Sequence, residues 1–100
     1  MKKITMYLGL NDQDTKIQKY WVVEAYKICM NLVGDFFGGG TISEWQWFFK
    51  HEDGQIVIEK SLIITTMTDK NHKDFVENLK KVFNQESILV EIDSPTISFE

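Results

Sequence analysis

Three large aromatic side chains recur at every second position in the middle of the chain, at Trp45, Trp47 and Phe49. A strand places alternate residues on one face, so this spacing predicts a row of rings along one side of a strand. Large exposed rings in a row are usually buried by another part of the protein, by a second subunit or by a ligand. The row could stack on a flat ligand, or it could form the core of a subunit interface, and the sequence favours the interface.

Carboxylates accompany this aromatic row. Glu44 precedes it on the same predicted strand, and Glu59 lies on the next one, on the same face as Ser61. A carboxylate on an open sheet face could bind a ligand, or it could act as an acid or base if burial raised its pKa. The alternative for both glutamates is a cross-strand ion pair or a solvated edge, and we favour this alternative.

A polar triplet, Gln85-Glu86-Ser87, joins the second predicted helix to the strand that follows it. These side chains could hydrogen-bond the loop backbone and close the helix, which is a structural role. Alternatively, they form the rim of a pocket together with Tyr7 and Glu59. The two interpretations have equal support from the sequence.

No residue pattern indicates a metal site or a cofactor. His51 and His72 have no companions at the spacing of metal ligands, such as a helical pair four residues apart. Cys29 lies on an apolar helical stripe without a neighbouring histidine, so we expect it in the core rather than as a nucleophile. We therefore predict no cofactor, no metal and no catalytic set.

The 100 residues, 43% of them hydrophobic and 26% charged, indicate one soluble domain spanning 1–100. The net charge is −4 and the 11 positive charges, all lysines, are spread thinly, which argues against nucleic-acid binding. We find no apolar stretch long enough to span a membrane and no export signal, and we expect a cytoplasmic protein. A single cysteine excludes an internal disulfide.

The chain alternates between strand and helix patterns. Apolar residues at every second position predict a strand over 4–10, and steps of three and four predict a helix from Ile17 to Val33, ended by Gly34. Strands follow at Thr41–Lys50 and Gln55–Thr68, and Asp69 or Asn71 caps a second helix. The buried stripe of the first helix comprises Trp21, Ala25, Ile28 and Leu32, and that of the second comprises Phe75, Val76, Leu79, Val82 and Phe83. A further strand is predicted at 87–92, with a short edge extension at 96–99.

This β-α-β-β-α-β order predicts an α+β, ferredoxin-like sandwich, in which an antiparallel sheet has two helices on one face. The other face is then open, and we expect Tyr7 and part of the aromatic row there. A bulge in the hairpin would reverse the face that the row occupies. Pairing of two open sheet faces would bury the rings, so we expect a homodimer.

Several segments resemble one family in their order along the chain: Tyr7-Leu8-Gly9-Leu10, the segment from Asp53 to Leu62, Gln85-Glu86-Ser87 and Ile97-Ser98-Phe99. The chain resembles DUF3574, a family of small bacterial domains of unknown function. The similarity spans nearly the whole chain and is most specific at Gln85–Ser87. The chain departs from the family at Gly38-Gly39, where proline and aspartate are common. The resemblance implies the fold and assigns no activity.

Two hypotheses about function follow. The first is a non-enzymatic small binding protein, a homodimer that holds a partner protein or small molecule on its aromatic sheet face. Its binding residues would be Tyr7, Glu44, Trp45, Trp47, Phe49, Glu59, Gln85 and Glu86. The alternative is a small dimeric enzyme with Glu59 or Glu86 as acid or base in a cavity between sheet and helices. The absence of arginine suggests an AT-rich genome, and a phage inhibitor or sequestering protein fits this setting.

Overall fold

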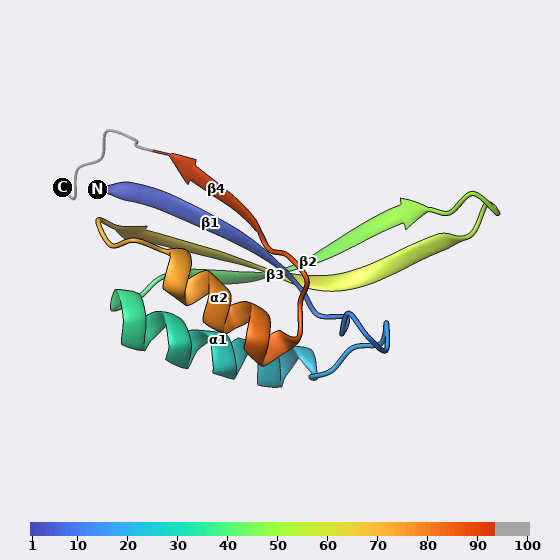
Figure 1. Cartoon of the computed structure of the whole chain (residues 1–100), viewed down its shortest axis with the longest axis horizontal. Helices are drawn as coiled ribbons and strands as arrows, with labels where there is room; N and C mark the ends of the chain where they lie inside the picture. The colour runs from blue at the N-terminus through green and yellow to red at the C-terminus, as the bar shows by residue number, and fades with distance from the viewer. Residues whose placement is uncertain (94–100) are drawn as a thin grey trace.

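The computed structural model describes residues 1–93, so the edge extension predicted at 96–99 lies outside the described residues. The elements are β1 (Lys2–Gly9), α1 (Val22–Phe37), β2 (Thr41–Lys50), β3 (Ile56–Thr68), α2 (Lys73–Phe83) and β4 (Leu89–Asp93). The strands form one sheet in the order β2-β3-β1-β4, and all neighbouring strands are antiparallel. Both helices cover the same face of the sheet (Figure 1), which confirms the predicted α+β ferredoxin-like fold.

The core lies between this face and the helices. On β1 every second side chain, from Ile4 to Leu8, is fully buried, and the facing residues Leu62 and Ile64 of β3 are buried with them. Each such side chain stabilises the fold by about 1.5–3 kcal/mol relative to an exposed one. The helices contribute buried residues in steps of four, which are Ala25, Cys29 and Val33 from α1 and Phe75, Leu79 and Phe83 from α2.

The first helix differs from its prediction at both ends. It begins at Val22, and Trp21, placed in the predicted buried stripe, precedes the helix with 78% of its surface exposed. Gly34 does not end the helix. The helix continues to Phe37, because the rings of Phe36 and Phe37 pack against Phe75 of α2. The end comes at Gly38, whose φ of 90° suits glycine and whose N–H donates to the Gly34 carbonyl at 3.0 Å.

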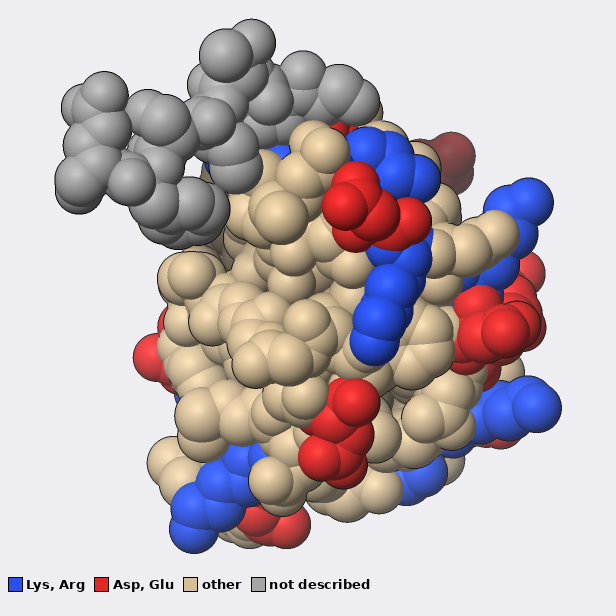
Figure 2. Space-filling view, turned by 90° about the vertical axis from the view of Figure 1, so that its left-hand side faces the viewer, with Lys and Arg blue, Asp and Glu red and all other residues tan. Residues whose placement is uncertain are grey.

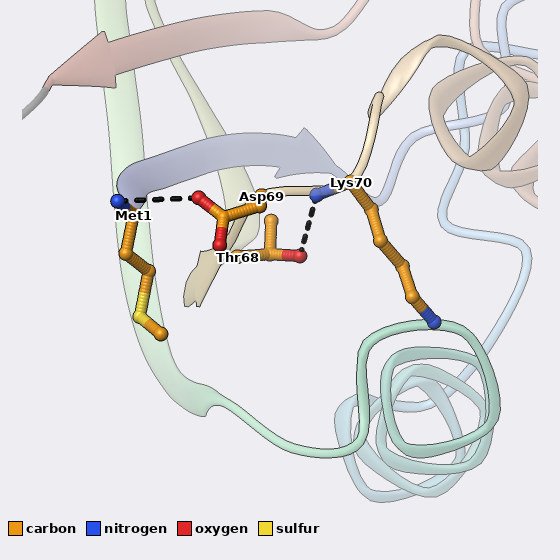
Figure 3. Close-up of polar contacts among 4 residues, drawn as sticks. All are labelled: Met1, Thr68, Asp69 and Lys70. Atoms are coloured by element: carbon orange, nitrogen blue, oxygen red, sulfur yellow. Dashed lines mark hydrogen bonds and ion pairs between the residues drawn. The ribbon is translucent and has the colours of Figure 1, made fainter.

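The turn between β3 and α2 ties three parts of the chain together. Asn71, rather than Asp69, accepts a hydrogen bond from the backbone at the start of α2, at 2.9 Å. Asp69 instead lies 3.2 Å from the amino group of Met1, while the N–H of Lys70 donates to Thr68 Oγ1 at 3.0 Å (Figure 3). The Lys70 side chain donates to a carbonyl in the last turn of α1. These contacts join the start of β1 to both helices.

The β2–β3 hairpin continues past the ends of both helices (Figure 1). We call this outer part, residues 46–60, the hairpin arm. On the side of the sheet that faces the helices, the arm carries Phe48, Ile56 and Ile58, which are 70%, 65% and 58% exposed. The helices end before they could cover these side chains. These three apolar side chains are therefore uncovered within the described residues, and Lys50 and Lys60 share their face.

Charged side chains of both signs alternate over the end of the molecule that carries the N-terminus (Figure 2). Neither sign forms a continuous patch on that face, in keeping with the thin spread of the lysines along the chain. A nucleic-acid surface requires clustered positive charge, which this face does not offer. Among residues 1–93, neither helix has the length and apolarity needed to cross a bilayer.

Candidate functional site

The sheet face opposite the helices carries an open hollow of about 880 Å³. Side chains of β1, β2 and β3 form its floor, and those of β4 line one side. Two loops lie together at one end: the segment after β1, from Asn11 to Gln13, and the segment after α2, from Gln85 to Ser87. The hollow thus lies where four strands and two loops meet.

The rings of Tyr7, Trp45 and Trp47 form what we call the aromatic corner of this hollow. The Tyr7 and Trp45 ring centres lie 5.4 Å apart at 52°, and those of Trp45 and Trp47 lie 6.1 Å apart at 68°. The first contact is tilted and the second is edge-to-face, the arrangement that aromatic pairs prefer over face-to-face stacking. Because Trp45 is 42% and Trp47 52% exposed, their surfaces remain accessible to a ligand. The helices of the chain do not cover them.

Carboxylates lie beside the aromatic corner. The half-buried Glu59 accepts a hydrogen bond from the backbone N–H of Asn11, with 3.2 Å between the nitrogen and Oε2. Glu91, on β4, raises the pKa of Tyr7, chiefly through a hydrogen bond, with desolvation and charge repulsion adding to it. The Tyr7 phenol therefore keeps its proton at neutral pH and can donate a hydrogen bond.

A polar network holds the loop after β1 against the end of α2. The Asn84 side-chain amide donates to one carboxylate oxygen each of Asp12 and Asp14, at 2.9 Å. The hydrogen bond from Asn84, with backbone N–H groups adding to it, lowers the pKa of Asp12. Gln85 donates from Nε2 to the Asn11 carbonyl at 2.6 Å. Gln85 thus has the structural role considered for it, and it also lines the hollow.

The hollow brings together most of the residues that the sequence nominated. They are Tyr7, Trp45, Trp47, Phe49, Glu59, Gln85 and Glu86. Glu44 does not belong to this set, and its nomination needs correction. It pairs with Leu62, whose side chain lies in the core, and paired residues share a face of the sheet. Glu44 therefore projects from the face that carries the helices, away from the hollow. Adjacent residues of a strand point to opposite faces, which separates Glu44 from its neighbour Trp45.

Sequence reasoning missed Glu91, Gly9 and Asn11, which also line the hollow. A signal for Glu91 existed, because it alternates with the apolar Val90 and Ile92 and so shares the open face with Tyr7. Gly9 and Asn11 had no such signal. Their closeness to Glu59 depends on the register between β1 and β3.

The histidines and the cysteine have different surroundings. Burial raises the pKa of Cys29 to about 12, and its side chain lies in the core, as the helical stripe predicted. His51 lines the outer end of the hollow next to the Phe49 ring, and His72 precedes α2. Within residues 1–93, histidine, cysteine and acidic side chains nowhere gather in threes around a possible ion.

The sequence matches no protein-family model and no curated protein, so the resemblance to DUF3574 stays a prediction. Solved structures, however, are similar. A phage SAM lyase in its apo state superposes with a TM-score of 0.63 at 22% identity, over 92% of this chain and 78% of that one. A phage SAM lyase in complex with S-methyl-5'-thioadenosine superposes with a TM-score of 0.59 at 22% identity, over 92% and 79%. At this level of identity the similarity shows a shared fold.

Proposed function

We propose that this chain binds S-adenosylmethionine in the hollow of its open sheet face and cleaves it to S-methyl-5'-thioadenosine. The observation that carries the proposal is the meeting of aromatic rings with carboxylates in one open hollow, at Tyr7, Trp45, Glu59 and Glu91. The fold shared with a phage SAM lyase supports it. This moves our preference from a non-enzymatic binding protein to an enzyme, but with its site on the open sheet face rather than in the cavity between sheet and helices that the enzyme alternative assumed.

The chemistry of the hollow suits an adenosyl sulfonium. A flat adenine can stack on Trp45, and ring faces attract a positively charged sulfur. Carboxylates such as Glu59 accept hydrogen bonds from ribose hydroxyls and from an ammonium group. The chain has no arginine and a net charge of −4, which disfavours phosphate-bearing nucleotides but not a nucleoside. The residues therefore favour an adenosine derivative without phosphate.

The proposed reaction needs no second substrate. The bond between the γ carbon and sulfur breaks, and its electron pair stays on sulfur, which becomes a neutral thioether. Two routes can complete the reaction. In the first, the γ carbon bonds to the substrate's own carboxylate oxygen, which closes a lactone. In the second, the β carbon loses a proton to a base, which forms an alkene. Glu59 is the candidate base for the second route because it is half-buried in the hollow, whereas Glu86 is exposed.

Purified protein incubated with S-adenosylmethionine tests the proposal, with products separated by liquid chromatography and identified by mass spectrometry. We expect S-methyl-5'-thioadenosine, and the mass of the second product separates the lactone from the alkene route. S-adenosylhomocysteine, whose sulfur is uncharged and a poor leaving group, is the control and should stay intact. Binding without product would return the chain to the sequestering role, and absence of both would refute the proposal.

We also propose that the protein forms a homodimer through the hairpin arm. Phe48, Ile56 and Ile58 expose apolar surface that monomeric proteins rarely leave uncovered. Native mass spectrometry and light scattering test this. We expect a dimer for the natural chain and a monomer for Ile58→Asp, and a monomeric natural chain would overturn the assignment. The similarity to a phage protein and the lack of arginine both support a phage setting.

A further inference from the structure

Gly9, the last residue of β1, lies against the carboxylate of Glu59. A Cβ atom placed on Gly9 would stand 2.5 Å from Glu59 Oε1 and 2.9 Å from its Cδ, closer than real Cβ contacts. The positive-φ glycines of the described residues are Gly38 and Gly54, so the Gly9 backbone conformation does not require glycine. The requirement comes from the close approach of the carboxylate alone.

The loop after β1 holds the other oxygen of the same carboxylate. The Asn11 N–H donates to Glu59 Oε2 at 3.2 Å, and the Asn11 carbonyl accepts from Gln85 Nε2 at 2.6 Å. Gln85 is itself held, because its backbone N–H donates to the Lys80 carbonyl at 2.9 Å. A chain of contacts thus runs from the end of α2 to Glu59.

We infer that Gly9 and Gln85 are positioning residues that fix the Glu59 carboxylate in the hollow, an inference that rests on the proposed function. Gly9 leaves the space that the carboxylate occupies, and Gln85 holds the Asn11 peptide that donates to Oε2. Within residues 1–93, Oε1 accepts no hydrogen bond and is left for a hydroxyl or cationic donor of the substrate. An acceptor fixed beforehand loses little conformational entropy when the substrate binds.

Nuclear magnetic resonance tests the geometry without any ligand. The backbone amide resonance of Asn11 should move in Glu59→Gln, because the charged acceptor of its hydrogen bond is lost. Gly9→Ala should also move it, because the added methyl group displaces a flexible carboxylate rather than backbone. Gly39→Ala is the matched control, since nothing lies within 4 Å of a Cβ there. An Asn11 amide resonance that stays in place in Gly9→Ala would overturn the inference.

The rate of S-methyl-5'-thioadenosine release tests the consequence. Gly9→Ala should slow it about a hundred-fold, the effect of a misplacement near 1 Å, and should have no further effect in a Glu59→Gln background. Equal loss in both backgrounds would show that Gly9 acts through the fold and would overturn the inference. Thermal unfolding of each variant checks that it folds.

Gln85→Ala should slow release about three- to ten-fold, chiefly through the loss of its neutral hydrogen bond to the Asn11 carbonyl, the shorter of the two that Nε2 donates. Its matched control is Gln18→Ala, because Gln18 Nε2 also donates to a backbone carbonyl of this loop, that of Tyr20, away from the hollow. Equal effects of the two changes would remove Gln85 from the proposal. If the Asn11 amide behaves as expected but the natural chain releases no product, the proposed function fails while the positioning of Glu59 stands.

Discussion

Replacing Trp45 by alanine should weaken the binding of S-methyl-5'-thioadenosine strongly without unfolding the protein. The Trp45 ring lies between Tyr7 and Trp47 and keeps 42% of its surface exposed to the hollow. Stacking of a base on one aromatic side chain contributes about 1–3 kcal/mol, and 1.4 kcal/mol corresponds to a tenfold change in affinity. The dissociation constant should therefore rise between about five-fold and a hundred-fold.

The loss of stability in Trp45→Ala should be smaller than the total free energy of unfolding. Trp45 forms one aromatic pair with Tyr7 and one with Trp47, and each pair contributes about 0.5–1.5 kcal/mol. A domain of this size is stable by about 5–15 kcal/mol. The Trp45→Ala variant should therefore show a cooperative thermal transition at a reduced midpoint. A variant without a cooperative transition would show that Trp45 belongs to the structural core.

Isothermal titration calorimetry with S-methyl-5'-thioadenosine measures the effect on binding. Trp21→Ala is the matched control, since Trp21 is 78% exposed and does not line the hollow. Its dissociation constant should stay within about two-fold of the natural one, the range of a neutral surface change. Equal losses for Trp21→Ala and Trp45→Ala, or no loss for Trp45→Ala, would refute the assignment of the aromatic corner as the adenine site.

Further predictions concern stability and reactivity. Because hydrogen bonding, chiefly from Asn84, lowers the pKa of Asp12 in the folded protein, its contribution to stability is present above about pH 4 and lost as pH falls through the lowered pKa. Asp12→Asn should flatten this acid limb in thermal unfolding at a series of pH values, and an unchanged limb would contradict it. Leu62→Ala should cost about 2–5 kcal/mol in denaturant unfolding, against under about 1 kcal/mol for the exposed Ile17→Ala, and similar losses would contradict the assigned core. The Cys29 thiol, with its pKa raised to about 12, should react with thiol reagents only after denaturation, and rapid labelling of native protein would contradict its burial.

The fold could be predicted from the sequence because the apolar positions of the strands and of the helices all face one core. Ile4 and Met6 on β1, and Leu79 on α2, recur at the spacing of their elements and meet in the core. The start of α1 did not follow. The segment before it is held by contacts to distant residues, including the bond from Lys19 to the Val82 carbonyl, and no local pattern encodes these.

The candidate site was partly visible for the same reason. The spacing of Trp45 and Trp47 places both rings on one face whatever the neighbouring strands do. The contact of Gly9 and Asn11 with Glu59 depends instead on which residues of two strands lie opposite each other, and register is a tertiary property. Composition and spacing therefore indicate that a surface can bind, whereas the precise supports of one carboxylate emerge only from the assembled sheet.

A crystal structure of the protein grown with S-methyl-5'-thioadenosine is the decisive test of the proposed binding site. We expect the adenine ring against Trp45 in the open-face hollow and a ribose hydroxyl within hydrogen-bond distance of Glu59. A ligand bound instead in the groove between the helices, lined by Phe36 and Phe75, would contradict it. So would crystals that contain no ligand at concentrations that saturate the protein in solution.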